Sequence, residues 1–270
     1  MKMNRRDALH HIVGISGVAV GASLLPNSVI AMETGYIIQP GEKLRYVPLD
    51  PMTVAKLAYN TGNGCMYQVF HSVIYSLGQS NSVDAEKFRT IPTALAAYGW
   101  AGVMGQGTIC GNLNALAMLV NILDDVNGQQ SALVDAMYRF FERETLPYSH
   151  KEFIDGIGST DDKTLEVGQS SIANSITCHS SISNWSKASG KSFSQKKERC
   201  YRLSASVVHK LVELLNAAHN GADIAQLTGL TITEETAQCQ TCHSTSKPLA
   251  PASSVKTNME CTTCHTGHFF

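Results

Sequence analysis

Residues 198–219 read ERCYRLSASVVHKLVELLNAAH. Nearly every third or fourth position is an apolar residue or a cysteine, which is the spacing of one face of an α-helix. The residues on this face are Cys200, Leu203, Val207, Leu211, Leu214 and Ala218. The sequence therefore predicts a long helix with a buried face that includes the Cys200 thiol, and it places His209 on the opposite, solvated side.

The same spacing recurs through the middle of the chain. Further helices are expected at Met52–Asn60, Cys65–Leu77, Pro92–Tyr98, Asn112–Val126, Ser131–Glu144 and Leu165–Cys178. The Pro- and Gly-spaced residues 32–50 are expected to form an extended arm, and the polar residues 180–197 an exposed loop. The predicted fold class is mainly α, with a helical N-terminal domain at residues 32–228 and an irregular C-terminal segment at residues 229–270.

Two copies of the pattern C-x-x-C-H lie in this C-terminal segment, at residues 239–243 and 261–265. In this order two thiols can add to the vinyl groups along one edge of a haem, and the adjacent histidine can reach the iron. The residues expected to attach two c-type haems per chain are Cys239, Cys242, Cys261 and Cys264. His243 and His265 are then the proximal axial ligands, so residues 229–270 become a dihaem-binding segment.

A zinc ribbon is the competing interpretation of these four cysteines, because two C-x-x-C pairs at this separation can hold one zinc ion. A histidine directly follows both pairs, however, and a site of four thiolates does not need it. The N-terminus also indicates an exported protein, which favours haem over zinc.

The first 31 residues have the composition of an export signal. Arg5 and Arg6 are a twin-arginine pair, residues 12–25 are mostly apolar, and residues 29–31 (VIA) form a small-residue cleavage site. Export to the periplasm by the twin-arginine (Tat) route is therefore expected, with the signal removed. The segment carries three basic residues and one acidic residue, so its removal changes the formal net charge from −1 to −3. Such a chain is not expected to bind nucleic acid, and no later stretch has the length and apolarity of a membrane span.

Four cysteines remain outside the haem motifs: Cys65, Cys110, Cys178 and Cys200. In an exported protein an even remainder is typical of two disulfides, but four thiolates can equally hold an iron–sulfur cluster of the 2Fe–2S or 4Fe–4S type. Cys110 lies near the end of a run with five glycines, residues 99–111. Free backbone N–H groups in such a run would stabilise a thiolate or a cluster sulfide. The residues alone leave both possibilities open.

Together these features resemble the split-Soret cytochromes c of sulfate-reducing bacteria. The resemblance rests on the Cys65 helix, the run ending at Cys110-Gly111, the pair Cys178-His179, Cys200 and the two C-terminal motifs. The N-terminal part is also similar to redox proteins with a C…GCAxxG…C…C pattern. In that pattern residues 110–115 (CGNLNA) take the place of the GCAxxG box, with Cys-Gly where the family has Gly-Cys-Ala.

The resemblance implies a mainly helical homodimer with two c-type haems per chain, clustered near the interface, and an iron–sulfur centre. It implies that each haem iron has two histidine ligands and that one of them crosses from the other subunit. Carried onto this sequence, Cys65, Cys110, Cys178 and Cys200 become the cluster ligands. For the distal ligands we favour His150, in a Pro-Tyr-Ser loop, and His179, beside a proposed cluster cysteine.

Two functions fit these expectations. With two histidines on each iron no coordination site is open, and the chain would carry single electrons to or from a periplasmic redox partner. The alternative is a haem oxidoreductase whose open iron reduces a small molecule such as nitrite or peroxide. No Ser/His/Asp or paired-carboxylate constellation indicates hydrolysis. Glu142 and Glu144, beside Arg139 and Arg143, are expected to form a solvated helix face.

Overall fold

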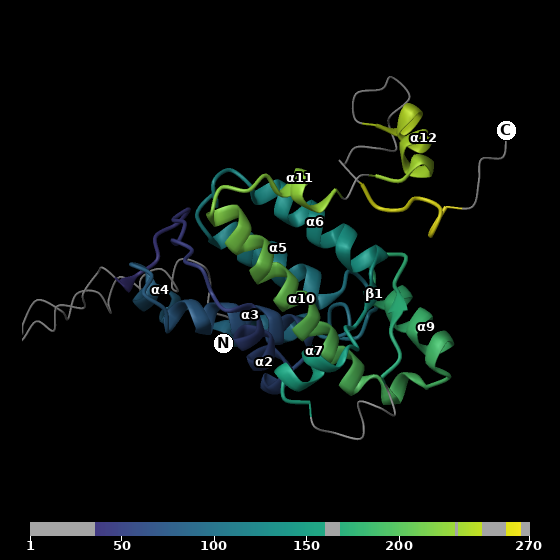
Figure 1. Ribbon diagram of the computed structural model, residues 1–270, viewed down its shortest axis with the longest axis horizontal. Helices are drawn as coiled ribbons and strands as arrows, with labels where there is room; N and C mark the ends of the chain where they lie inside the picture. The colour runs from purple at the N-terminus through teal and green to yellow at the C-terminus, as the bar shows by residue number, and fades with distance from the viewer. Residues whose placement is uncertain (1–35, 160–167, 230–231, 245–257, 266–270) are drawn as a thin grey trace, which may run out of the picture. The chain divides into compact units, whose positions relative to one another are not determined.

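The computed structural model describes residues 36–159, 168–229, 232–244 and 258–265. The described residues from Ile37 onward belong to one compact unit, and the expected export signal lies outside the described residues. Helices pack on helices, beside one two-stranded sheet (Figure 1). This confirms the predicted mainly α class. Within the described ranges, no helix combines the length and apolarity needed to cross a membrane.

In chain order the helices are α2 (Pro51–Thr61), α3 (Cys65–Gly78), α4 (Ala85–Thr90), η2 (Thr93–Gly99), α5 (Gly111–Ile122), α6 (Gln130–Arg143), α7 (Lys151–Gly156), α9 (Cys178–Ser189), η3 (Phe193–Gln195), α10 (Lys197–His219), α11 (Ile224–Thr228) and α12 (Glu234–His243). The strands β1 (Thr145–Leu146) and β2 (Ser171–Ile172) pair antiparallel, with Leu146 opposite Ser171.

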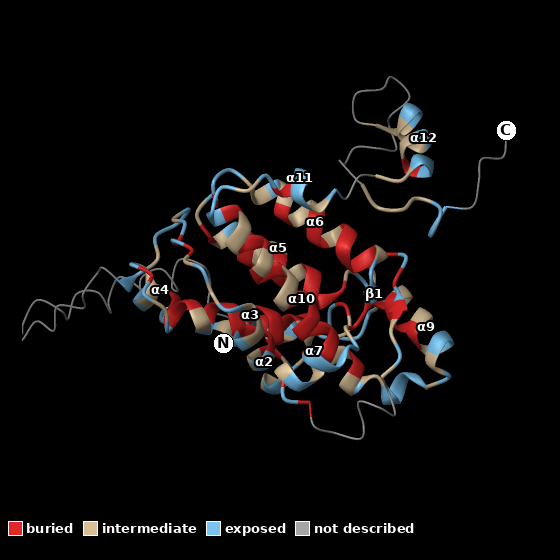
Figure 2. Cartoon of the chain, viewed as in Figure 1, coloured by how far each residue is buried: buried red, intermediate tan, exposed pale blue. Residues whose placement is uncertain are grey.

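Helix α10 lies at the centre of the core, where it packs against α2, α3, α5 and α6 (Figure 1). The apolar residues of its predicted face are at most 3% exposed (Figure 2). Ser206 is also buried, and its hydroxyl is satisfied because it donates to the Arg202 carbonyl one turn earlier. The prediction for His209 is wrong: this side chain is half-buried, since its ring packs edge-on against Tyr148 and Phe153.

The expected arm is extended, but it is part of the core. Leu44 and Tyr46 are fully buried. The amide of Leu44 donates to the Ile122 carbonyl at the end of α5. Asn216 of α10 holds the following residues: its Oδ1 accepts from the Tyr46 hydroxyl (2.7 Å) and from the amide of Leu49 (3.1 Å), and its Nδ2 donates to the Leu49 carbonyl (2.8 Å).

One predicted helix is misplaced. Residues 168–177 of the range predicted as helix hold strand β2, and helix α9, which begins at Cys178, occupies residues 180–189 of the range expected to be an exposed loop. Thr177 caps α9 by accepting from a backbone amide in its first turn, and Gly190 ends it in the left-handed conformation. The serine-rich composition conceals this helix in the sequence, but its inner side buries Trp185 completely.

The first haem motif is helical, whereas an irregular segment was expected. Thr233 caps α12 by accepting from the amide of Thr236, and the helix runs to His243, so that residues 239–243 form its last turn. The second motif begins in a turn in which the amide of His265 donates to the Cys261 carbonyl (3.0 Å).

The contact between the arm and α10 gives the first testable prediction. Asn216→Ala removes three hydrogen bonds and leaves the buried Tyr46 hydroxyl without its acceptor. We expect the free energy of unfolding to fall by about 2–4 kcal/mol in urea denaturation. Asn220→Ala, at the exposed end of the same helix, is the matched control and should change it by less than about 0.5 kcal/mol. Equal effects of the two substitutions would contradict this account.

Candidate metal centre and haem-attachment segment

The four cysteines outside the haem motifs line one cavity of about 400 Å³. They come from four elements: Cys65 begins α3, Cys110 directly precedes α5, Cys178 begins α9, and Cys200 lies in the first turn of α10. All four are free thiols in the structure. The four cysteines predicted from the sequence as cluster ligands thus lie together at one cavity.

The glycine-rich run forms one wall of this cavity because its backbone folds back on itself. Ala101, Val103 and Met104 all have positive φ angles between 48° and 54°, a conformation that costs free energy for residues with a side chain. The run then pairs with the start of α9. The amide of Cys178 donates to the Thr108 carbonyl (2.7 Å), and the amide of Cys110 donates to the Ile176 carbonyl (3.0 Å). These bonds hold Cys110 and Cys178 on the same cavity.

Two of the thiols form a coupled pair. A hydrogen bond from the Cys110 thiol lowers the pKa of Cys65 to about 7, although burial works in the opposite direction. The pKa of Cys110 is raised, first because this bond needs its proton and second because the thiol is buried. Near neutral pH the pair therefore gives up one proton readily and retains the other.

Burial raises the pKa of Cys178 to about 12, and negative charge on Cys65 and Cys200 contributes further. Burial also raises the pKa of Cys200, while the neighbouring Arg199 guanidinium lowers it. Buried thiols that repel one another as thiolates are stabilised by a cation, and iron binding would release their protons.

Two buried donors at the cavity have no hydrogen-bond partner in the described part of the chain: Asn112 Nδ2 and Arg199 Nε. The amide oxygen of Asn112 accepts from Ser204 (2.9 Å), and Nη2 of Arg199 donates to Ser181 (2.8 Å). Four thiols with two unsatisfied donors fit an anionic, sulfur-rich group such as an iron–sulfur cluster. Across the described ranges, no three His, Cys, Asp or Glu side chains are arranged to hold a single metal ion.

The residues predicted to attach the haems lie on α12 and on residues 258–265. Cys242, Cys264 and His265 are exposed, and Cys239, His243 and Cys261 are half-buried. Burial, followed by the charge and hydrogen bonding of the neighbouring Cys239, raises the pKa of Cys261. The first cysteines of the two motifs are therefore neighbours, while the second cysteines are open to solvent and accessible for thioether formation.

The two candidates for distal ligands lie in different places. His179 lines a cavity of about 740 Å³ together with Thr262 and Thr263 of the second haem motif. His150 precedes α7, where its exposed ring contacts Tyr148 and Phe153, and it does not line that cavity. Of these two histidines, the structure brings only His179 to the haem-attachment segment of its own chain.

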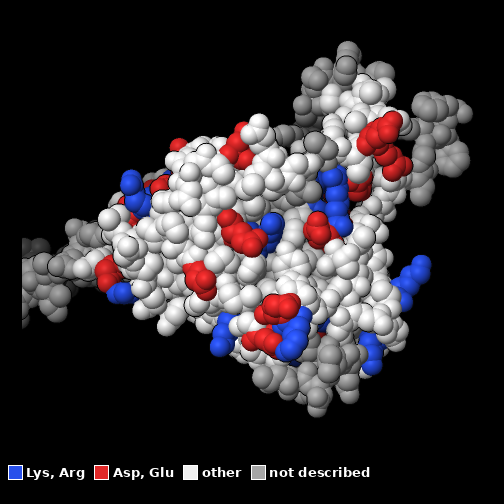
Figure 3. Space-filling view, viewed as in Figure 1, with Lys and Arg blue, Asp and Glu red and all other residues white. Residues whose placement is uncertain are grey.

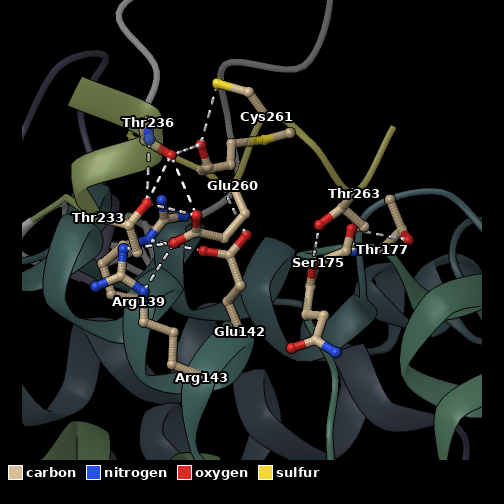
Figure 4. Close-up of polar contacts among 12 residues, drawn as sticks. Arg139, Glu142, Arg143, Ser175, Thr177, Thr233, Thr236, Glu260, Cys261 and Thr263 are labelled. Atoms are coloured by element: carbon tan, nitrogen blue, oxygen red, sulfur yellow. Dashed lines mark hydrogen bonds and ion pairs between the residues drawn. The ribbon is translucent and has the colours of Figure 1, made fainter. Parts of the chain in front are cut away.

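The prediction of a solvated face on α6 is wrong for two of its residues. Arg139 and Glu142 are 3% and 0% exposed, and they pair through Nε and Oε2 at 3.3 Å. Glu142 Oε1 accepts from the amide of Glu260, and Arg143 Nη2 donates to a Glu260 carboxylate oxygen at 2.7 Å (Figure 4). The i, i+3 spacing of Arg139 and Glu142 looks like a surface pair in the sequence. Only the position of Glu260 directly before Cys261 hints at its role.

The close packing at the start of α5 gives a second prediction. A Cβ atom on Gly111 would lie 2.7 Å from the Cys65 sulfur and 2.4 Å from the Gly99 carbonyl oxygen. Gly111→Ala should therefore displace Cys65 and destabilise the fold by about 1–3 kcal/mol. We expect a lower midpoint in thermal unfolding and faster alkylation of Cys65, mapped by mass spectrometry. Gly78→Ala is the control, because the atom closest to a Cβ at position 78 belongs to the movable Arg89 side chain. If only Gly78→Ala lowers the unfolding midpoint, this explanation of the packing at Gly111 is wrong.

Comparison with known proteins places these features in a family. Residues 70–214, more than half of the chain, match the family described as "Putative redox-active protein (C_GCAxxG_C_C)". The matched range contains Cys110, Cys178 and Cys200, and Cys65 lies just before it.

Nearly the whole chain is similar to a protein named "Split-Soret cytochrome c" from Desulfovibrio desulfuricans. The two are 27% identical over 288 aligned residues, which cover 99% of this chain and 96% of the relative. The fold is similar to that in "A novel iron centre in the split-Soret cytochrome c from Desulfovibrio desulfuricans ATCC 27774", with a TM-score of 0.67, 24% identity, and coverage of 86% of this chain and 92% of the other. The resemblance drawn from the sequence is thus confirmed, and the chain belongs to the C_GCAxxG_C_C family of redox-active proteins.

Proposed function

We propose that this chain is a periplasmic dihaem c-type cytochrome that carries single electrons. In this proposal the two haems stack, each iron has two histidine ligands, and an iron–sulfur cluster occupies the four-cysteine cavity. Similarity to a cytochrome c with an iron centre supports the coarser part, a redox protein that carries iron. One observation carries the finer part: the cysteine cavity and the haem-attachment segment meet at two adjacent residues, Cys178 and His179.

These two residues begin helix α9, and the backbone holds both of them. The amide of Cys178 donates to Thr108, and the amide of His179 donates to the Gly107 carbonyl (3.1 Å). Cys178 lines the 400 Å³ cavity and His179 the 740 Å³ cavity, while a third cavity of about 580 Å³ is lined by both. A centre at each residue would be separated by a few covalent bonds, which suits transfer of an electron between them.

The bound groups would each supply a one-electron couple. The chain supplies attachment, orientation and electrostatics. Cys239, Cys242, Cys261 and Cys264 would attach the haems, with His243 and His265 on the proximal side. Cys65, Cys110, Cys178 and Cys200 would hold the cluster, with Arg199 offsetting part of its negative charge.

A homodimer with the haems near its interface completes the proposal. The short C-terminal segment is too small to cover two macrocycles by itself, and a second subunit would bury the remaining haem surface. His150 lies away from the haem segment of its own chain, and in a dimer it would serve a haem of the other copy. Tat export and exchange of electrons with a periplasmic redox partner are the parts of the proposal that rest on the sequence alone.

The visible spectrum of the purified protein tests this function. In the dithionite-reduced state we expect a split Soret band, because stacked haems couple their electronic transitions, and we expect no change when CO is added. A single band that shifts with CO would instead indicate an open iron and the alternative oxidoreductase. A protein with no Soret band would instead indicate that the C-terminal cysteines bind zinc.

Replacement of the candidate distal ligands provides a second test. His179→Ala should leave one haem iron per chain open, so that about half of the haem becomes high-spin and binds CO. His150→Ala should open the other haem. His219→Ala, an exposed histidine at the end of α10, is the control and should leave both haems low-spin. If His179→Ala also leaves both irons closed to CO, the assignment of His179 is wrong.

A further inference from the structure

Glu260 is the residue directly before the second haem motif, and its side chain is only 16% exposed. It is the meeting point of three parts of the chain: helix α6, the start of helix α12, and its own segment, residues 258–265 (Figure 4). Glu260 belongs to neither C-x-x-C-H motif, and neither haem attachment nor axial ligation would use it.

On the side of α6, Glu260 is held by three contacts. Arg143 donates to Glu260 Oε1 through both Nε (3.1 Å) and Nη2 (2.7 Å). The backbone amide of Glu260 donates to Glu142 Oε1 (3.1 Å). Charge-assisted bonds of this kind are about twice as strong as neutral ones, so α6 fixes both the backbone and the side chain of Glu260.

On the side of α12, the second carboxylate oxygen of Glu260 accepts from two threonines. Thr233 donates to Oε2 at 2.7 Å and Thr236 at 3.1 Å. Thr233 is also the cap residue of α12, the helix that carries the first haem motif. One carboxylate therefore joins the residue before the second motif to the helix of the first.

Two exposed hydrogen bonds act in the same direction. Thr262, inside the second motif, donates to Glu235 of α12 (3.2 Å). Thr263 donates to the Asn174 carbonyl (2.6 Å), in the loop before α9 (Figure 4). The two motifs are thus tied to each other and to the helical unit by residues that do not touch a haem iron.

The charges around Glu260 balance within the network, with two carboxylates against two guanidinium groups. Hydrogen bonds from Thr233, Arg143 and Thr236 outweigh the effect of burial and hold the pKa of Glu260 below its usual value, while burial raises the pKa of Glu142. Arg139 is almost completely buried. Because a buried charge without a partner is costly, loss of Glu260 would leave an excess of positive charge at α6. Elsewhere on the face shown in Figure 3, acidic and basic side chains are interspersed at the surface.

We propose that Glu260 is a positioning residue that fixes the two haem-attachment motifs against each other and against helix α6. The inference rests on the proposed function in one respect, that the two motifs carry haems. Its consequence is that Glu260 sets the separation and relative orientation of the two haems of one chain. Haem–haem coupling would then depend on a contact made by protein side chains alone.

The test compares wild-type holoprotein with Glu260→Ala. Backbone hydrogen exchange in peptides covering residues 234–243 and 258–265 should become about tenfold faster or more, because several hydrogen bonds to a charged group are lost. Exchange in α10 should stay unchanged. Both haems should remain covalently attached by mass, while the two Soret maxima of the reduced protein merge towards one. Wild-type exchange rates and wild-type Soret splitting in this variant would overturn the proposal.

Two further variants sharpen the result. Asp155→Ala removes a carboxylate from an exposed ion pair with Lys151 on α7 and should behave as wild type. Arg143→Met should resemble Glu260→Ala, and the double variant should be no worse than the stronger single one, because both act through one contact. Additive effects of the two substitutions would overturn the direct link between Arg143 and Glu260.

The outcome separates this inference from the proposed function. A wild-type protein without covalent haem, or with a single Soret band, would contradict the dihaem electron carrier. The exchange measurement would still decide whether Glu260 holds the two motifs, since it needs no haem signal.

Discussion

The burial of helix α10 fixes the positions of the functional residues in the helical unit. Its inner face packs against helices that include α2, α3, α5 and α6, and residues at three places along it hold other parts of the chain. Cys200 in its first turn lines the thiol cavity. Arg202 and Ser206 bind the backbone of Tyr148 through Nη1 and Oγ. Asn216 near its end holds the arm. A rigid centre of this kind lets loops with strained backbone, such as residues 101–104, persist beside the cavity.

Each candidate site contains a buried arginine beside groups that can carry negative charge. Arg199 is 1% exposed and lies at the thiol cavity, while Arg139 is 3% exposed and lies beneath the haem-attachment segment. Removing a guanidinium group from water is costly unless it is paired. At the second site Glu142 and Glu260 provide the pairing. At the first, burial raises the pKa of Cys178 and of Cys200, and the Arg199 guanidinium offsets only part of this effect. Thiolates holding a bound metal would supply the negative charge that pairs with Arg199.

The sequence predicts those features that depend on local spacing. The C-x-x-C-H motifs can be recognised in the sequence because covalent attachment and proximal ligation of a haem would need five consecutive residues. Helices α2, α3, α6 and α10 follow from apolar periodicity. Most of helix α9 lies in a range predicted as a loop, because its serines mask a short apolar side ending at Trp185. The contact between Arg143 and Glu260 could not be predicted, since it joins residues 117 positions apart, and a charged pair on a helix is usually solvated.

The same arrangement bears on the order in which such a protein could be assembled. In the proposed function, the Tat route would carry the helical unit in its folded state, whereas covalent haem attachment would need accessible thiols. The helical unit has a continuous hydrophobic core, and among the described C-terminal residues Met259 alone packs against its edge. Residues 234–243 and 258–265 are held mainly by polar contacts at the surface, and Cys242 and Cys264 are exposed. Haem could therefore be attached to this segment after the helical unit has folded, because its core does not have to open.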